Sequence, residues 1–135
     1  MINFTKIHKM MRMNNQKVIN TKGGQSVEGI LYDLIVTIVN KGRADKIVEV
    51  SKKAGAEGGT IIFGRGTGIH EQAKLFGIPI EPEKEIVLTL IPKEKTQVVL
   101  ESILNNTELS KPGKGIAFVL PVDKIAGMNH DYLNK

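Results

Sequence analysis

The chain has 135 residues, of which 41% are hydrophobic and 24% are charged, and this mixture is typical of one globular domain. It contains no cysteine, which excludes disulfides and thiolate metal sites and fits a reducing compartment. The longest apolar runs, at residues 34–39 and 86–91, are far shorter than the roughly 18 residues that a membrane-spanning helix requires. Because no secretory pattern follows the N-terminus either, we expect a cytoplasmic protein.

The net charge of +5 is concentrated near the N-terminus. Residues 1–31 carry five basic residues and one acidic residue, a net charge of +4, whereas residues 32–135 carry 14 basic and 13 acidic residues, a net charge of +1. A nearly neutral domain does not favour nucleic-acid binding. We expect residues 1–31 to be a basic extension, flexible or partly helical, and residues 32–135 to form the folded domain.

The folded domain begins with a predicted β-α-β unit. Residues 33–39 are rich in β-branched side chains and end at a turn, which indicates a buried strand. Apolar residues then recur at helical spacing from Ala44 to Ala54, and Gly55 stands where a left-handed residue commonly ends a helix. Residues 60–63 are the second predicted strand.

A second β-α-β unit follows. Residues 85–91 are the third predicted strand, and Pro92 stands at the first turn of a second helix. A loop over residues 105–115 precedes the fourth strand, residues 116–122. This βαββαβ order predicts a ferredoxin-like α+β fold, with an antiparallel four-stranded sheet and both helices on one face. Because the first and third strands are apolar at almost every position, we expect the helix-free face to be covered by another subunit.

The connection between the second and third strands spans residues 64–84. A hairpin needs only two to five residues, so this length is typical of a functional loop. Residues 70–76 predict a helical turn within it.

Two glycine-rich loops carry cations, one after the second strand and the other before the fourth. Backbone N–H groups of glycines can approach an anion closely, and lysine and arginine donate charge-assisted hydrogen bonds to phosphate. Neither loop is a P-loop or a dinucleotide fingerprint, so ordinary turn glycines remain the alternative. The candidate residues are Gly64, Arg65, Gly66, Thr67 and Gly68 in the first loop, and Lys111, Gly113, Lys114 and Gly115 in the second.

The runs IVNKGRADKIVEVSKKAGAEGGTIIFGRGTG, EIVLTLIPKE and KPGKGIAFVLPVDKI resemble the PII nitrogen-regulatory superfamily of signalling proteins over about residues 33–127. The resemblance implies a trimer of ferredoxin-like subunits that binds an adenine nucleotide (ATP, ADP, AMP or a cyclic form) between subunits. It also implies a non-catalytic regulator that acts on a target protein, a membrane transporter or a metabolic enzyme, through the loop 64–84. From the residues themselves we predict no metal cofactor.

The same resemblance assigns roles to individual residues. Thr60 matches a strand-two threonine that contacts adenine. Gly64 and Gly66 match glycines at the base of the long loop, and Gly113 and Gly115 match glycines of a phosphate-cradling loop.

This chain also departs from the best-known PII proteins. They have an aspartate between the last two glycines and a lysine just after them, whereas this chain has Lys114 and Ile116. Their phosphate-clamping arginines align with Gly127 and Asn129, and the glutamine used for magnesium and 2-oxoglutarate aligns near Gly68. The long loop also lacks a tyrosine. We therefore expect a divergent member with a different nucleotide preference and without classical 2-oxoglutarate sensing.

The sequence does not favour catalysis. Its histidines have no metal-ligand spacing, and no Ser-His-Asp grouping stands out. The acidic residues on or beside the long loop are expected to be solvated. The residues concerned are His8, His70 and His130, and Glu71, Glu81, Glu83 and Glu85.

Two alternative functions share the predicted architecture. A CutA-type trimeric metal-tolerance relative would need clustered metal ligands, and this chain offers no thiolates. An RRM-like RNA-binding module would need exposed aromatic side chains on the central strands, whereas only Phe63 and Phe118 lie on predicted strands.

Overall fold

The computed structural model describes residues 17–19, 26–27, 30–68, 74–75, 77–79 and 82–128. The predicted βαββαβ order is confirmed, and the observed strands are slightly longer than the predicted ones. A single 3-10 turn, η1 (Glu108–Ser110), separates the second helix from the last strand of this unit. The elements are β3 (Tyr32–Asn40), α2 (Ala44–Lys53), β4 (Thr60–Arg65), β7 (Glu83–Pro92), α3 (Lys93–Asn106) and β8 (Gly115–Val122).

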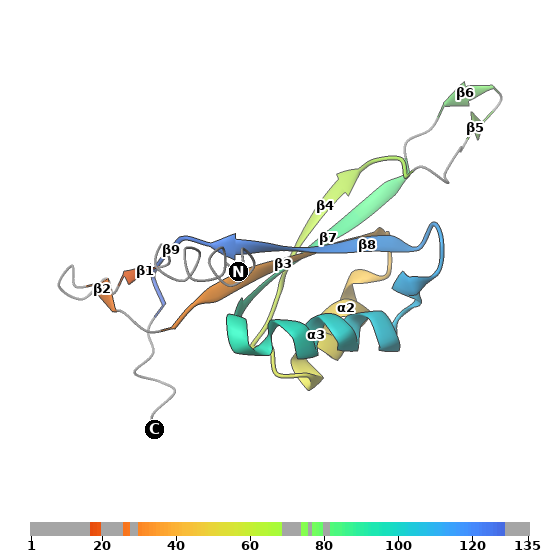
Figure 1. Ribbon diagram of the computed structural model, residues 1–135. Coiled ribbons are helices and arrows are strands. Elements are labelled where there is room, and N and C mark those ends of the chain that lie inside the picture. The colour runs from red at the N-terminus through yellow and green to blue at the C-terminus, as the bar shows by residue number, and fades with distance from the viewer. Residues whose placement is uncertain are drawn as a thin grey trace, which may run out of the picture.

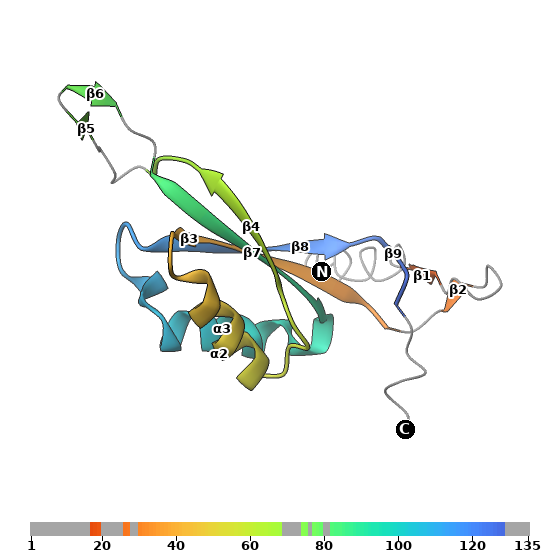
Figure 2. The same ribbon diagram turned by 180° about the vertical axis from the view of Figure 1, so that it is seen from behind.

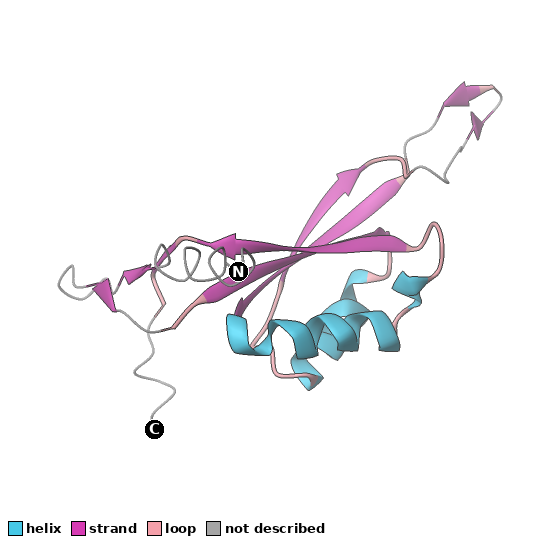
Figure 3. Cartoon of the chain, in the orientation of Figure 1, coloured by secondary structure: helices cyan, strands magenta, loops and turns pink. Residues whose placement is uncertain are grey.

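These four strands form one antiparallel sheet in the order β4-β7-β3-β8. The central strand β3 pairs with β7 on one side and β8 on the other, so that Val36 lies opposite both Leu88 and Phe118. Both helices lie on one face of the sheet (Figures 1 and 3). The predicted ferredoxin-like fold is therefore confirmed.

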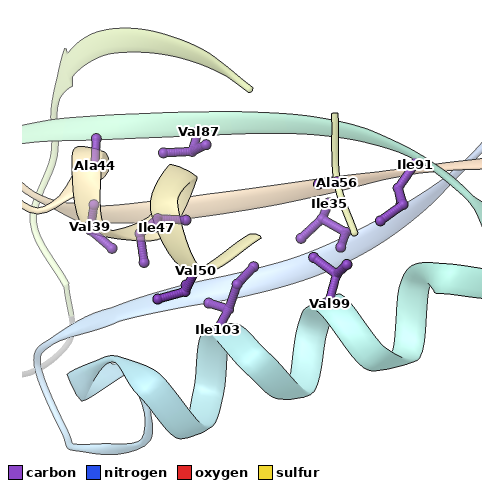
Figure 4. Packing of buried hydrophobic residues seen from close by; sticks show 10 residues of the cluster. All are labelled: Ile35, Val39, Ala44, Ile47, Val50, Ala56, Val87, Ile91, Val99 and Ile103. Carbon is purple, nitrogen blue, oxygen red and sulfur yellow. The ribbon is translucent and has the colours of Figure 1, made fainter. Parts of the chain in front are cut away.

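The hydrophobic core lies between this face and the two helices (Figure 4). Side chains alternate between the two faces of a strand, and every second residue of β3 and β7 points toward the helices. Fully burying one aliphatic side chain of this size stabilises the fold by about 1.5 to 3 kcal/mol. The cluster contains Ile35, Val39, Ala44, Ile47, Val50, Ala56, Val87, Ile91, Val99 and Ile103.

A polar contact fixes α3 to the sheet, and a glycine ends α2. Thr96 Oγ1 of α3 donates a hydrogen bond of 2.9 Å to Asp33 Oδ2 of β3. At the other helix, α2 is followed by Gly55 with φ +119°, the left-handed conformation predicted for its end.

The N-terminus of α2 is capped by a carboxylate from a distant strand. Glu85 Oε1 of β7 accepts hydrogen bonds from the backbone N–H groups of Gly42, Arg43 (3.0 Å) and Ala44 (3.2 Å). The prediction of a solvated Glu85 is wrong, because the residue is only 9% exposed. Pairing with Val39 at the end of β3 brings Glu85 to the helix terminus, where unpaired N–H groups and the helix dipole stabilise a negative charge.

The opposite face of the sheet is apolar and has no helix over it among the described residues (Figure 3). We call it the open sheet face. Its outer side chains are between 38% and 56% exposed. They are Ile62, Leu90, Ile116, Phe118 and Leu120, which the strand register places on one side of the sheet.

A small sheet at one end of the main sheet includes part of the N-terminal extension (Figures 1 and 2). Its order is β2-β1-β9, with β1 (Lys17–Ile19), β2 (Ser26–Val27) and β9 (Lys124–Ala126). β1 runs parallel to β9, which follows β8 in the chain. Residues 17–19 and 26–27 of the extension are therefore strands, which the sequence did not predict.

A two-stranded hairpin within the loop 64–84 lies beyond the opposite end of the sheet (Figure 1). It consists of β5 (Lys74–Leu75) and β6 (Ile78–Pro79), joined through Gly77 with φ +80°. The predicted helical turn over residues 70–76 is wrong at β5, and its remaining residues lie outside the described ones.

The Glu85 cap can be tested by substitution. Glu85→Ala is expected to lower the free energy of unfolding by about 1 to 3 kcal/mol, because the N–H groups at the α2 terminus lose their acceptor. Glu85→Gln keeps an amide oxygen and should lose less. Urea denaturation followed by circular dichroism measures both.

Glu101→Ala on the exposed side of α3 is the matched control, and its unfolding free energy should change by less than about 0.5 kcal/mol. If the urea midpoint of Glu85→Ala equals that of the wild type, the cap makes no net contribution to stability.

Candidate functional site

The two glycine-rich loops lie at the same end of the sheet because of its strand order. β3 and β4 both end there, and β7 and β8 both begin there, since each of them is antiparallel to its neighbour. The loops line one cleft of about 770 Å³ within a single chain. This volume is in the range of roughly 300 to 1,000 Å³ that is usual for small-molecule sites.

The cleft has an apolar floor and a polar rim. The floor comes from the open sheet face, where Ile38, Ile86 and Ile116 lie on neighbouring strands. The predicted site residues that line the cleft are Arg65, Gly66, Thr67 and Gly68 from the first loop, and Lys111, Gly113 and Gly115 from the second.

Charge around the cleft has one sign. Arg65, Lys84 and Lys111 line it, and no acidic side chain occurs among the described residues of its wall. Lys84 Nζ also donates a hydrogen bond to Asn40 Oδ1 at the end of β3. A concave surface with an apolar floor and several cations suits a ligand that combines a flat apolar group with anionic groups.

Two glycines of the cleft are present for different reasons. Gly115 has φ +144°, and a Cβ added there would lie 2.5 Å from the carbonyl oxygen of Ile38, so the approach of β8 to β3 requires glycine. Gly66 has no atom within 4 Å of an added Cβ. The fold therefore does not require glycine at Gly66, whose effect is to leave that part of the wall without a side chain.

Three of the predicted site residues do not line this cleft. Thr60 begins β4 opposite Leu88, on the open sheet face. Gly64 lies in a separate shallow hollow beside Phe63. Lys114 is on the far side of its loop, with Nζ 3.9 Å from Glu108 Oε2.

The base of the loop 64–84 is fixed to the turn after β3. Lys41 Nζ lies 2.6 Å from Glu83 Oε2, and Gly66 N donates to the carbonyl oxygen of Pro82 at 3.1 Å. The hydrogen bond and charge of Lys41 lower the pKa of Glu83, with a further contribution from Arg65, and the same hydrogen bond raises the pKa of Lys41. Glu83 is exposed, as predicted, although it is paired.

The sequence did not reveal several residues of the wall, because strand register and chain reversal bring them there. Lys84 reaches the cleft by pairing with Gly64 across β4 and β7. The position of the loop 105–115 before β8 was a signal only for the wall residues that this loop supplies. The missed residues are Ile38, Lys84, Ile86, Leu109, Ser110, Pro112 and Ile116.

Features required by the alternative functions are weak in the described part of the chain. No group of three His, Cys, Asp or Glu side chains there could hold a metal ion, while His8, His70, His130, Glu71 and Glu81 lie outside it. No helix in the same residues is long and apolar enough to cross a membrane.

The two aromatic residues on the predicted strands are also far apart in the sheet, and Tyr32, which begins the central strand β3, is buried at 4% exposure. Phe63 lies on β4 and Phe118 on β8, at opposite edges of the sheet, instead of on its central strands. A stacking platform of the RRM kind requires exposed aromatic side chains on the central strands, so this arrangement gives that alternative little support.

One known protein family matches the part of the chain that forms this fold. The family model of the nitrogen regulatory protein P-II matches residues 32–131, which include β3 to β9 and both glycine-rich loops. Residues 1–31 lie outside the match. Among curated proteins, none matches the chain. Because the family match covers nearly all of the predicted domain, the chain belongs to the P-II nitrogen regulatory protein family, whose members are non-catalytic regulators.

Proposed function

We propose that this protein is a cytoplasmic, trimeric PII-like signalling protein that binds an adenine nucleotide between subunits. It regulates a target protein, a membrane transporter or a metabolic enzyme, through the loop 64–84. The observation that most supports this function is the cleft, which combines an apolar floor with the cations Arg65, Lys84 and Lys111. An adenine ring has apolar faces and phosphates are anionic, so one nucleotide satisfies both parts of the cleft.

The glycine-rich loops supply the donors for phosphate. Gly66, Thr67, Gly68 and Gly113 present main-chain atoms at the cleft. Of these, Gly66 N is already bonded to the carbonyl oxygen of Pro82, so the cationic side chains are the stronger candidates for direct contact. The sequence predicts no metal cofactor, and we include none in the proposal.

The open sheet face supports the trimer. A contiguous apolar surface on a sheet usually marks a contact with another protein, and in a closed three-fold ring this face of each subunit can pack against its neighbours. The floor of the cleft belongs to this face, so a neighbouring subunit placed there would also close the cleft. Thr60 lies on the same face, and it is in a position to contact a nucleotide held by the adjacent subunit.

The loop 64–84 supports the target contact. Residues 65–68, near its start, line the cleft, while the β5–β6 hairpin lies beyond the sheet (Figure 2). A two-stranded hairpin has unpaired backbone groups on its outer edges, and these can pair with a strand of another protein. A ligand at the cleft therefore acts at the start of the segment that meets the target.

Nucleotide binding is measured by calorimetry of the full chain with ATP, ADP, AMP, cyclic AMP and cyclic di-AMP. We expect heat with at least one of them. Lys111→Ala and Arg65→Ala should each weaken the bound nucleotide by about 1.5 to 3 kcal/mol, because each loses a charge-assisted hydrogen bond. Lys53→Ala on α2 removes the same charge far from the cleft and should bind as the wild type does. The nucleotide proposal fails if none of the five ligands gives heat.

The trimer is tested by light scattering on the purified chain, with an expected mass about three times 14.8 kDa. Leu120→Glu should dissociate it, because a buried unpaired carboxylate at the subunit contact is costly. Val98→Glu, at another exposed apolar position on α3, is the control and should stay trimeric. A wild-type mass near that of one chain would contradict the trimer. If the Leu120→Glu variant remains trimeric, the subunit contact does not lie on the open sheet face.

A further inference from the structure

One carboxylate in the second glycine-rich loop region faces three cations. Glu108 Oε1 lies 3.5 Å from Lys111 Nζ, and Glu108 Oε2 lies 3.9 Å from Lys114 Nζ and 4.0 Å from Arg43 Nη2. Both carboxylate oxygens are thus engaged, and one negative charge is shared among three positive ones. The cluster keeps an excess of positive charge that a second anion would neutralise.

Glu108 stands at the wall between two hollows. Lys111 lines the large cleft. Glu108, Lys114 and Arg43 line a smaller hollow of about 250 Å³ on the other side of the loop. Leu109 contributes to both hollows, so the segment from η1 to β8 forms the partition between them. The carboxylate therefore draws Lys114 away from the cleft and holds Lys111 at its edge.

The backbone that carries Glu108 is well anchored. Thr107 Oγ1 donates to the carbonyl oxygen of Ile103 and accepts from Leu109 N at 3.4 Å. Lys111 N donates to the carbonyl oxygen of Glu108 at 2.9 Å. The backbone position of Glu108 is therefore set by main-chain and hydroxyl contacts, and it does not depend on the ion pairs of the side chain.

The ion pairs themselves are easily exchanged. The side chains of Glu108 and Lys114 are each 46% exposed, and exposed pairs of this kind contribute little because water and salt screen them. A phosphate group carries more charge than a carboxylate and accepts more hydrogen bonds. A phosphate in the cleft can consequently take Lys111 from Glu108 without unfolding the loop.

We propose that Glu108 is an internal competitor for the phosphates of the ligand and sets the charge preference of the site. It pairs with the lysines in the free protein, and it repels the ligand once they turn to the phosphates. Coulomb repulsion grows with ligand charge, so Glu108 disfavours a nucleoside triphosphate more than a monophosphate. This inference rests on the proposed function, because it assumes that a nucleotide occupies the cleft.

Glu108→Gln tests the inference, because it keeps the size and hydrogen-bonding atoms of the side chain and removes its charge. Calorimetry at low salt with AMP, ADP and ATP should show tighter binding, by about threefold for AMP rising to about tenfold for ATP. The gain should shrink at high salt. Glu101→Gln on α3 makes the same charge change away from the cleft and should leave all three affinities unchanged.

Repeating the measurement in a Lys111→Ala variant distinguishes the release of Lys111 from a general change in charge. In this variant the gain in nucleotide affinity from Glu108→Gln should become clearly smaller, because the Lys111 cation that the substitution would release is absent. An equal gain in both backgrounds would contradict the competition. Unchanged thermal midpoints for the variants confirm that each of them is folded.

The outcomes separate this inference from the proposed function. If the wild type binds none of the nucleotides, the proposed function fails first. If the wild type binds but Glu108→Gln binds equally or more weakly, the proposed function stands and the inference is overturned. A gain that does not increase from AMP to ATP would likewise overturn it.

Discussion

The carboxylate of Glu85 holds together the part of the molecule on which the site depends. It joins the start of β7 to the turn after β3 and to the first residues of α2, through the N–H groups of Gly42, Arg43 and Ala44. The chain returns from the loop 64–84 at this point, so the cap also determines where that loop ends. A buried carboxylate that accepts several N–H bonds satisfies donors that would otherwise be costly to bury.

The cleft depends on this frame more than on its glycines. Lys41 pairs with Glu83 beside the cap, and Gly66 N bonds to the carbonyl oxygen of Pro82, so the start and end of the long loop are held together. At the other wall, Gly115 brings β8 within reach of the Ile38 carbonyl because it has no Cβ. The two glycine-rich loops face one another because strands fix their ends, and the cations then give the cleft its chemical character.

The local part of the fold was predictable from the sequence, and the long-range part of the site was not. Helical and strand periodicity identified the βαββαβ order, and the left-handed Gly55 followed from its place after an amphipathic helix. Glu85 looked solvated because its partners lie up to 43 residues away. Lys114 lies on the same side of its loop as Glu108, a residue that belongs to no recognisable motif, and the parallel pairing of β1 with β9 joins segments that share no pattern.

The position of the cleft gives a physical reason why binding and assembly would be linked in the proposed trimer. Ile38, Ile86 and Ile116 form the floor of the cleft and belong to the open sheet face. A ligand on this floor and a neighbouring subunit on this face would bury adjoining apolar area, and a ligand that binds only the assembled form stabilises it by mass action. In the proposed trimer the exposed aliphatic side chains beside the cleft would therefore serve both contacts, while the cations Arg65, Lys84 and Lys111 would distinguish the ligand from the subunit.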